Sequence, residues 1–213
     1  DSRSVAGGAE FNLQAVNGRV LGDLSLDAYT RDIDLVLFPG DLVDGYTQME
    51  DEFEQELKSW AWVSEPVAAR VPVFEGIGNH EALVVQYSDN PYIFFDRKPP
   101  HSTEDVFARV FVNPCNGDFS EGEGLPGYRE NVYFFHMRDC LFVMANSNYW
   151  VGGKFPEKHG GNLEGYIMDR QMAWIEQVLK DEGPKARHIF FLTHEPAYPV
   201  SAHMKDGMWY WGG

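Results

Sequence analysis

Apolar residues occur along the chain in short runs that are typical of buried strands. Residues 35–38 (LVLF) and 71–74 (VPVF) are two such runs, and Pro or Gly follows each of them shortly afterwards. Residues 189–192 (IFFL) form a third run, and residues 132–136 and 141–145 flank an Arg-Asp turn. We therefore predict a strand at each of these five places.

Other stretches carry the spacing of helices. Helical periodicity is scattered over residues 13–29, and residues 103–112 predict a short helix. Thr47 followed by Glu50 resembles a capping box, which predicts a helix over residues 49–62. Near the C-terminal end, one face of an amphipathic helix is traced by Ile167, Gln171, Trp174, Ile175, Val178 and Leu179.

Three segments predict loops. Residues 89–100 are rich in Pro and aromatic residues, and residues 113–127 and 146–165 are rich in Gly. Loops as long as the last two are usually functional or mobile. Because strands alternate with helices, we predict a layered α/β fold, and the adjacent strands near residues 132–145 predict that its sheet is mixed.

Length and charge narrow the possible functions. The 213 residues suit one large domain or two small ones, and no apolar run approaches the roughly 18 residues of a membrane span. The formal net charge of −16 disfavours general nucleic-acid binding. A small phosphorylated substrate remains compatible with this charge, because bound metal cations reverse the local field.

Cysteine usage leaves the compartment open. Cys115 and Cys140 are too few for a disulfide framework. A bridge between them and two free thiols are both compatible with the sequence. A bridge would suit an extracytoplasmic protein, for which we have a slight preference. The sequence gives no indication of the oligomeric state.

Three predicted strands each lead directly into residues that bind metals. These segments are residues 38–45 (FPGDLVDG), 76–81 (GIGNHE) and 191–196 (FLTHEP). In α/β sheets, ligands bind in the crevice beyond the carboxyl ends of strands. Asp, Asn and His together offer oxygen and nitrogen donors that suit Mn, Zn or Fe. Each segment alone is more typical of a turn, but the ordered set of three points to a metal site.

The order GDLVDG, GNHE, THEP resembles the calcineurin-like metallophosphoesterase superfamily over nearly the whole chain. The resemblance implies an α/β/β/α sandwich with mixed sheets, formed by residues 1–213 as a single domain. It implies that Asp41 bridges two metal ions and that Asn79 and His194 bind the second. It also implies that Asp1 binds the first metal. His80 would contact the phosphate without binding metal.

The sequence departs from the family pattern in two places. The family's D-x-H block reads Asp1-Ser2-Arg3 here, and Arg3 cannot bind a metal because it stays protonated. Arg3 is instead expected to hold a phosphate oxygen. The family's terminal GH-x-H block does not occur in the chain. We therefore expect the sequence to be truncated at both ends.

Four further residues are candidates for supporting roles. Asp44 is expected to support the site from behind the metal ligands or to belong to a turn. His203 would line the pocket, or lie in an exposed loop. Glu81 and Glu195 each follow a site histidine, and each would either orient that histidine or face solvent.

The resemblance implies hydrolysis of phosphate esters by metal-activated hydroxide, with one or two divalent or trivalent Mn, Zn or Fe ions per chain. The substrate would be a small phosphomonoester or phosphodiester. Two alternatives remain. One is a metal-poor member that binds a phosphorylated ligand or a protein partner without turnover. The other is a metal-dependent hydrolase of another bond, such as an amide.

Overall fold

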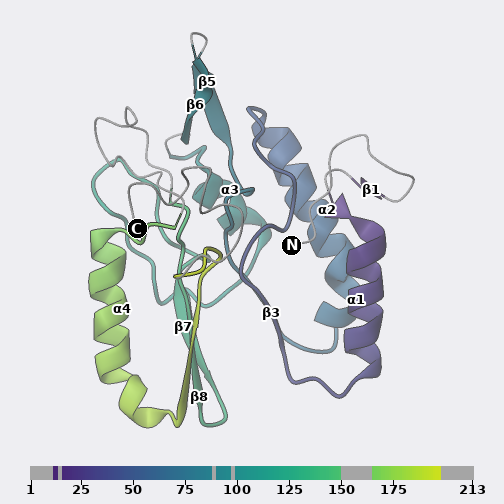
Figure 1. Ribbon diagram of the computed structural model, residues 1–213, viewed down its shortest axis with the longest axis vertical. Coiled ribbons are helices and arrows are strands. Elements are labelled where there is room, and N and C mark those ends of the chain that lie inside the picture. Colours follow the sequence, from purple (N-terminus) through teal and green to yellow (C-terminus); the bar gives the residue numbers. More distant parts are fainter. Residues whose placement is uncertain (1–11, 14–15, 88–89, 97–98, 150–164, 198–213) are drawn as a thin grey trace.

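The computed structural model describes residues 12–13, 16–87, 90–96, 99–149 and 165–197. The fold is α/β with mixed sheets, as expected (Figure 1). Helices α1 (Gly18–Thr30) and α2 (Glu50–Ala68) lie on one side of the molecule. Helix α4 (Asp169–Asp181) lies on the opposite side, and the strands that lead into the site run between them.

Two sheets carry the predicted strands. Strand β3 (Val36–Phe38) pairs in parallel with β4 (Val73–Glu75), so that Phe38 is level with Glu75. Strand β7 (Tyr133–Met137) pairs antiparallel with β8 (Cys140–Met144), which pairs in parallel with β9 (His188–Leu192). The second sheet is therefore mixed. The parallel strands in both sheets bring the ends of β3, β4 and β9 toward one region.

A ladder of aromatic rings joins the two sheets. Phe74 stacks on Phe135 with ring centroids 3.8 Å apart. Phe135 stacks on Phe142, and Phe142 stacks on Phe190, each with centroids 4.9 Å apart. The ladder thus runs from β4 across β7 and β8 to β9, and stacked rings of this kind add to the stability that apolar burial provides.

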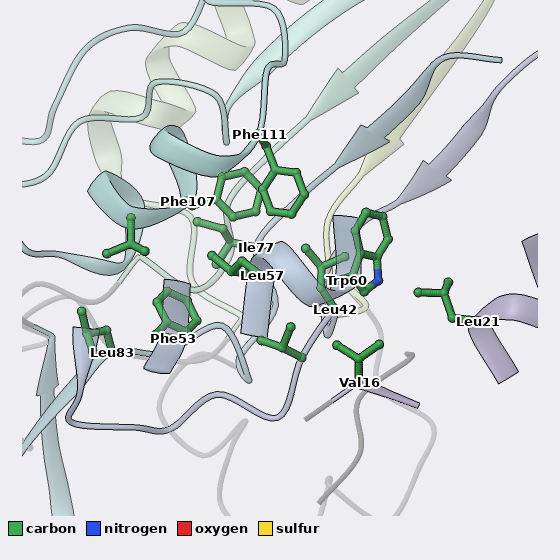
Figure 2. Packing of buried hydrophobic residues seen from close by; sticks show 12 residues of the cluster. Val16, Leu21, Leu42, Phe53, Leu57, Trp60, Ile77, Leu83, Phe107 and Phe111 are labelled. Carbon is green, nitrogen blue, oxygen red and sulfur yellow. The ribbon is translucent and has the colours of Figure 1, made fainter. Parts of the chain in front are cut away.

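The main hydrophobic core lies beneath the loops that follow β3 and β4. Helix α2 contributes Phe53, Leu57 and Trp60, which are almost completely buried. Helix α3 (Thr103–Val110) contributes Phe107, whose ring packs beside that of Phe111 (Figure 2). The loops themselves contribute the buried side chains Leu42, Val43, Ile77 and Leu83. The site loops are therefore anchored in the core by their own apolar residues.

The helix α2 begins one residue after its predicted start, but the predicted capping box and the predicted end were wrong. Thr47 does not form a capping box with Glu50: its hydroxyl accepts a hydrogen bond from the Met49 amide at 3.1 Å and donates to Glu52 at 2.6 Å. The helix also continues past the predicted end to Ala68, with Pro66 inside it. Val67 is buried in this last turn, and burial of its side chain offsets the hydrogen bond that Pro66 cannot donate.

The loop predicted over residues 89–100 was wrong in its central part. Strand β5 (Val84–Tyr87) pairs antiparallel with β6 (Asn90–Asp96), and together they form the hairpin at the top of Figure 1. Before α1, strands β1 (Asn12–Leu13) and β2 (Val16–Asn17) replace the first part of the helical pattern. A short 3₁₀ helix, η1 (Gly183–Lys185), follows α4.

The remaining structural expectations have clear outcomes. Helices α3 and α4 lie where the sequence predicted them, and Ser102 and Asp105 form a capping box at the start of α3. Cys115 and Cys140 are free thiols, which decides the alternative that the sequence left open. Among the residues described, no helix combines the length and the apolar character that crossing a membrane requires.

Candidate active site

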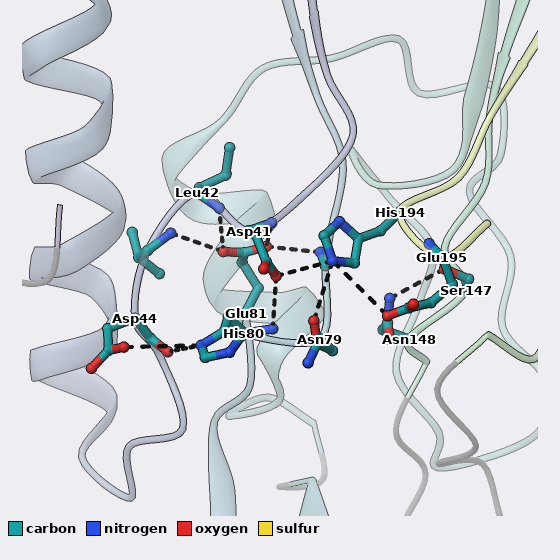
Figure 3. A network of polar contacts seen from close by, with 12 residues as sticks. Asp41, Leu42, Asp44, Asn79, His80, Glu81, Ser147, Asn148, His194 and Glu195 are labelled. Atoms are coloured by element: carbon teal, nitrogen blue, oxygen red, sulfur yellow. Dashed lines mark hydrogen bonds and ion pairs between the residues drawn. The ribbon is translucent and has the colours of Figure 1, made fainter. Parts of the chain in front are cut away.

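The ends of β3, β4 and β9 bring three predicted ligands together (Figure 3). His194 Nε2 lies 3.1 Å from Asp41 Oδ1 and 3.2 Å from Asn79 Oδ1. Asp41 is buried, and its backbone adopts the left-handed conformation with φ of 55°. Asp41, Asn79 and His194 follow three different strands, so the site forms only when both sheets are in place.

The separations between these donor atoms fit a shared metal ion. Ligand atoms at about 2.0–2.2 Å from a tetrahedral ion are about 3.4 Å from one another. The two separations from His194 Nε2, 3.1 and 3.2 Å, are close to that value. Within the described part of the chain, no three His, Cys, Asp or Glu side chains group as metal ligands, and the Asn79 amide supplies the third donor. Two oxygens and one imidazole nitrogen suit a borderline transition metal.

Asp41 and His194 shift each other's pKa values in opposite directions. Burial alone would raise the pKa of Asp41, but the hydrogen bond and charge of His194 hold it below its ordinary value. Burial alone would lower the pKa of His194, but the hydrogen bond and charge of Asp41 raise it above its ordinary value. The Asp41 carboxylate thus favours positive charge at the His194 imidazole. A metal bound by the same atoms would compete with a proton for the imidazole nitrogen.

Glu81 holds the loops after β3 and β4 against each other. Its carboxylate accepts hydrogen bonds from the amides of Asp41, Leu42 and Val43 at 2.7, 2.7 and 3.0 Å, and from Gly78 at 2.7 Å. The Glu81 side chain is only 2% exposed. Burial and the charge of Asp41 raise the pKa of Glu81 to about 7, while the amides of Val43 and Gly78 oppose this shift.

The two loops also meet without room for a further side chain. A Cβ atom added to Gly78 would lie 2.6 Å from Asp41 Oδ1, and one added to Gly45 would lie 1.5 Å from the His80 carbonyl oxygen. Gly45 has a φ of 58°, which favours glycine. These glycines allow the two backbones to approach closely enough for Glu81 to reach both loops.

His80 lies beside the ligand group and has one nitrogen in use. Its Nδ1 lies 2.6 Å from the backbone carbonyl oxygen of Asp44. Because a carbonyl oxygen only accepts hydrogen bonds, Nδ1 carries a hydrogen in this contact. The Asp44 carboxylate lies 4.0 Å from the same Nδ1. Asp44 thus supports His80 mainly through its backbone.

Tyr46 contacts two of these residues. Its hydroxyl oxygen accepts a hydrogen bond from Asn79 Nδ2 at 3.3 Å. Its ring packs edge-to-face against the His80 imidazole, with ring centroids 4.9 Å apart and an interplanar angle of 89°. Nothing in the sequence singled out Tyr46, because its approach depends on a left-handed backbone that residue types alone do not reveal.

The family model described as calcineurin-like phosphoesterase matches residues 17–212. The chain belongs to this family. Members of the calcineurin-like phosphoesterase family are in general hydrolases of phosphoesters, and they typically bind divalent metals. A search of curated proteins finds no match to the chain.

In this calcineurin-like phosphoesterase, some predicted site residues lie outside the described part of the chain. Asp1, Arg3 and His203 are among residues 1–11 and 198–213, so their positions stay predictions. Glu81 and Glu195 are both buried, so the alternative that they face solvent is wrong. The Glu195 amide donates to Ser147 Oγ at 3.3 Å, and its carboxylate lies 3.9 Å from His194 Nε2.

The sequence alone missed how much the phosphoesterase site depends on the loop after β8. Gln171 in α4 accepts a hydrogen bond from the Asn146 amide and donates one to the Asn146 carbonyl, both at 2.8 Å. This pair of bonds fixes the loop that carries Ser147 next to Glu195. The buried position of Gln171 on the apolar face of α4 was a usable signal, because a buried amide requires polar partners.

Proposed function

We propose that the protein is a metal-dependent hydrolase of small phosphate esters, either phosphomonoesters or phosphodiesters. The observation that carries this proposal is the convergence of Asp41 Oδ1, Asn79 Oδ1 and His194 Nε2, with His80 beside them. A chain that belongs to a phosphoesterase family and presents this donor set has the chemistry that the reaction requires.

Asp41, Asn79 and His194 would hold an Mn, Zn or Fe ion. Such an ion, when bound, polarises a phosphoryl oxygen and lowers the pKa of a bound water toward neutrality. The buried carboxylate of Asp41 would neutralise part of the ion's charge. Glu81 keeps Asp41 in place by binding the loop amides around it, so Asp41 needs little rearrangement to bind an ion.

His80 would act on the substrate rather than on the metal. Its Nδ1–H is held by the Asp44 carbonyl, so the ring has a fixed orientation and presents Nε2. A protonated Nε2 would donate a hydrogen bond to a phosphoryl oxygen and pass its proton to the departing alkoxide. This role requires a proton at Nε2 but no metal contact.

Arg3 and Asp1 complete the proposal. Asp1 would bind a first metal together with Asp41, and Arg3 would hold a phosphate oxygen through its guanidinium group. Because Arg3 replaces a nitrogen donor by a fixed positive charge, the first metal should bind more weakly than the second. His203 would line the substrate pocket.

Two variants separate the proposed roles. Asp41→Asn should lose both hydrolysis and metal content, since an amide cannot neutralise the ion. His80→Ala should lose turnover of an aryl phosphate by at least about a hundredfold while it keeps its metal. The matched control is His188→Ala, because His188 is an exposed histidine on β9. If both site variants keep full metal content and activity, the proposal is wrong.

Metal stoichiometry tests the role of Arg3. We expect the unmodified protein to bind one ion tightly and a second one weakly, and Arg3→His to strengthen the weaker site by about tenfold or more. Metal titration followed by elemental analysis measures both sites. Two equally tight ions in the unmodified protein, unchanged by Arg3→His, would contradict the role given to Arg3.

A further inference from the structure

Tyr46 is held in a backbone conformation that is unusual for a bulky side chain. Gly45 and Tyr46 are consecutive residues with left-handed φ angles of 58° and 50°. For residues other than Gly, Asn and Asp this conformation is strained, and such strain gathers at functional sites. The contacts of the Tyr46 side chain therefore indicate what this strained conformation provides.

The surrounding structure enforces this conformation from several sides. The Gly45 amide donates to the buried carboxylate of Glu56 in α2 at 3.0 Å. Thr47 forms a parallel bridge with Leu83, which anchors the end of the turn. Gly45 itself packs directly on the His80 backbone. Tyr46 is thus fixed between two anchored neighbours, and its side chain is directed at Asn79 and His80.

The hydrogen bond between Tyr46 and Asn79 affects the orientation of the Asn79 amide. It determines whether Oδ1 or Nδ2 faces the other predicted ligands. Oδ1 lies toward His194 Nε2 at 3.2 Å, and Nδ2 donates to the Tyr46 hydroxyl oxygen at 3.3 Å. Only the oxygen of an amide can bind a metal, because its nitrogen has no available lone pair. If the amide rotated by half a turn, Nδ2 would face His194 Nε2 in place of Oδ1, and the metal would lose a ligand.

We propose that Tyr46 is a positioning residue that selects the metal-binding orientation of the Asn79 amide. The hydroxyl gives Nδ2 an acceptor in the orientation that turns Oδ1 toward His194. Without this acceptor, the orientation that turns Nδ2 toward His194 Nε2 is no longer disfavoured by the loss of a hydrogen bond. This inference rests on the proposed function, because it assumes that Asn79 binds the metal.

The test measures metal affinity and does not depend on turnover. The affinity of the full chain for Mn²⁺ is measured by electron paramagnetic resonance of the free ion. We expect Tyr46→Phe, which keeps the ring against His80, to weaken Mn²⁺ binding by about tenfold. Tyr29→Phe is the matched control and should bind Mn²⁺ as the unmodified protein does, because Tyr29 is an exposed tyrosine of α1.

A second background shows whether Tyr46 acts through the amide. In Asn79→Asp the side chain has two equivalent oxygens, so it has no wrong orientation. Tyr46→Phe should then change Mn²⁺ affinity by no more than about twofold. An equal loss in both backgrounds, or no loss in the unmodified background, would overturn the inference. Absence of Mn²⁺ binding by the unmodified protein would instead refute the proposed metal site, and this inference with it.

Discussion

The two sides of the site are built in different ways. On one side, the loops after β3 and β4 are buried and share Glu81, which binds four of their amides. On the other side, His194 follows β9, whose residues Ile189, Phe190 and Phe191 are 48, 47 and 44% exposed. Asp41 is therefore held by a buried carboxylate, while His194 is held by a strand that packs less completely.

This difference indicates which contacts fix the positions of the site residues. Backbone amides have fixed directions, so one carboxylate that binds several of them fixes two loops at once. Strand β9 relies on pairing with β8 and on the ring of Phe190 stacked on Phe142. We infer that substitutions near Glu81 will affect both the stability of the fold and the geometry of the site. Substitutions on β9 will have smaller effects.

The largest effect is expected from Glu81→Ala. This change leaves four buried amides without their acceptor, and we expect a loss of about 4 kcal/mol in the free energy of unfolding. Urea denaturation measures it. Glu176→Ala, at an exposed position of α4, should change stability by less than about 0.5 kcal/mol. Equal effects of the two variants would contradict the importance given to Glu81.

Gly45→Ala should have the next largest effect. The added methyl group would lie 1.5 Å from the His80 carbonyl oxygen, so the two loops must separate. We expect a loss of about 3 kcal/mol and reduced turnover, measured by denaturation and aryl phosphate hydrolysis. As a control, Gly22→Ala has open space around it within α1 and should stabilise by about 0.5–1 kcal/mol. A Gly45→Ala variant with unchanged stability and turnover would show that the loops are not closely packed.

The aromatic ladder allows a direct comparison between a buried ring and an exposed ring. Phe142 on β8 is 8% exposed, and its neighbour Phe190 on β9 is 47% exposed. Phe142→Ala should cost about 3 kcal/mol of unfolding free energy, and Phe190→Ala about 1 kcal/mol. Thermal or urea unfolding of both variants checks the difference. If Phe190→Ala costs as much as Phe142→Ala, then β9 is more fully packed than its exposure indicates.

A further effect concerns the pH dependence of stability and the buried Glu56, which is 5% exposed. Burial raises the pKa of Glu56 from 4.5 to about 8, and the charges of Glu52, Asp44 and Glu81 add to the shift. A carboxyl whose pKa is higher in the folded state binds its proton more tightly there. Its contribution to stability is therefore complete below pH 4.5 and lost as the pH rises toward 8.

Glu56→Gln removes this titration. With a chelator present, the variant should match the unmodified protein at pH 5 and be more stable than it at pH 9. Urea denaturation at both pH values measures the change. Glu65→Gln, at an exposed position of the same helix, is the matched control. A Glu56→Gln variant that is less stable at pH 9 would reverse the assigned sign.

Local patterns in the sequence were sufficient for much of the fold and for the convergence of four candidate residues. The hairpin of β7 and β8, the helices α3 and α4, and the convergence of Asp41, Asn79, His80 and His194 followed from short runs and their boundaries. These features were predictable because each depends on residues that are close together in the chain, or on strands that end at the same edge.

Features that depend on distant partners could not be predicted in this way. Glu81 binds amides about forty residues away, and no pattern around residue 81 indicates them. Strand β6 contains Pro and aromatic residues typical of a loop, and its pairing with β5 decides its structure. The hydroxyl of Thr47 has several hydrogen-bond acceptors and donors in reach. The sequence pattern therefore did not determine which of them it binds.

The hydrogen bonds of Glu81 have a consequence for the motions of the site. The amides of Asp41, Leu42, Val43 and Gly78 share one acceptor side chain, although the whole of α2 separates Val43 from Gly78 along the chain. A fluctuation that withdraws Glu81 exposes all four amides to solvent together. Deuterium should therefore enter these positions with a common protection factor, as one cooperative opening of both loops.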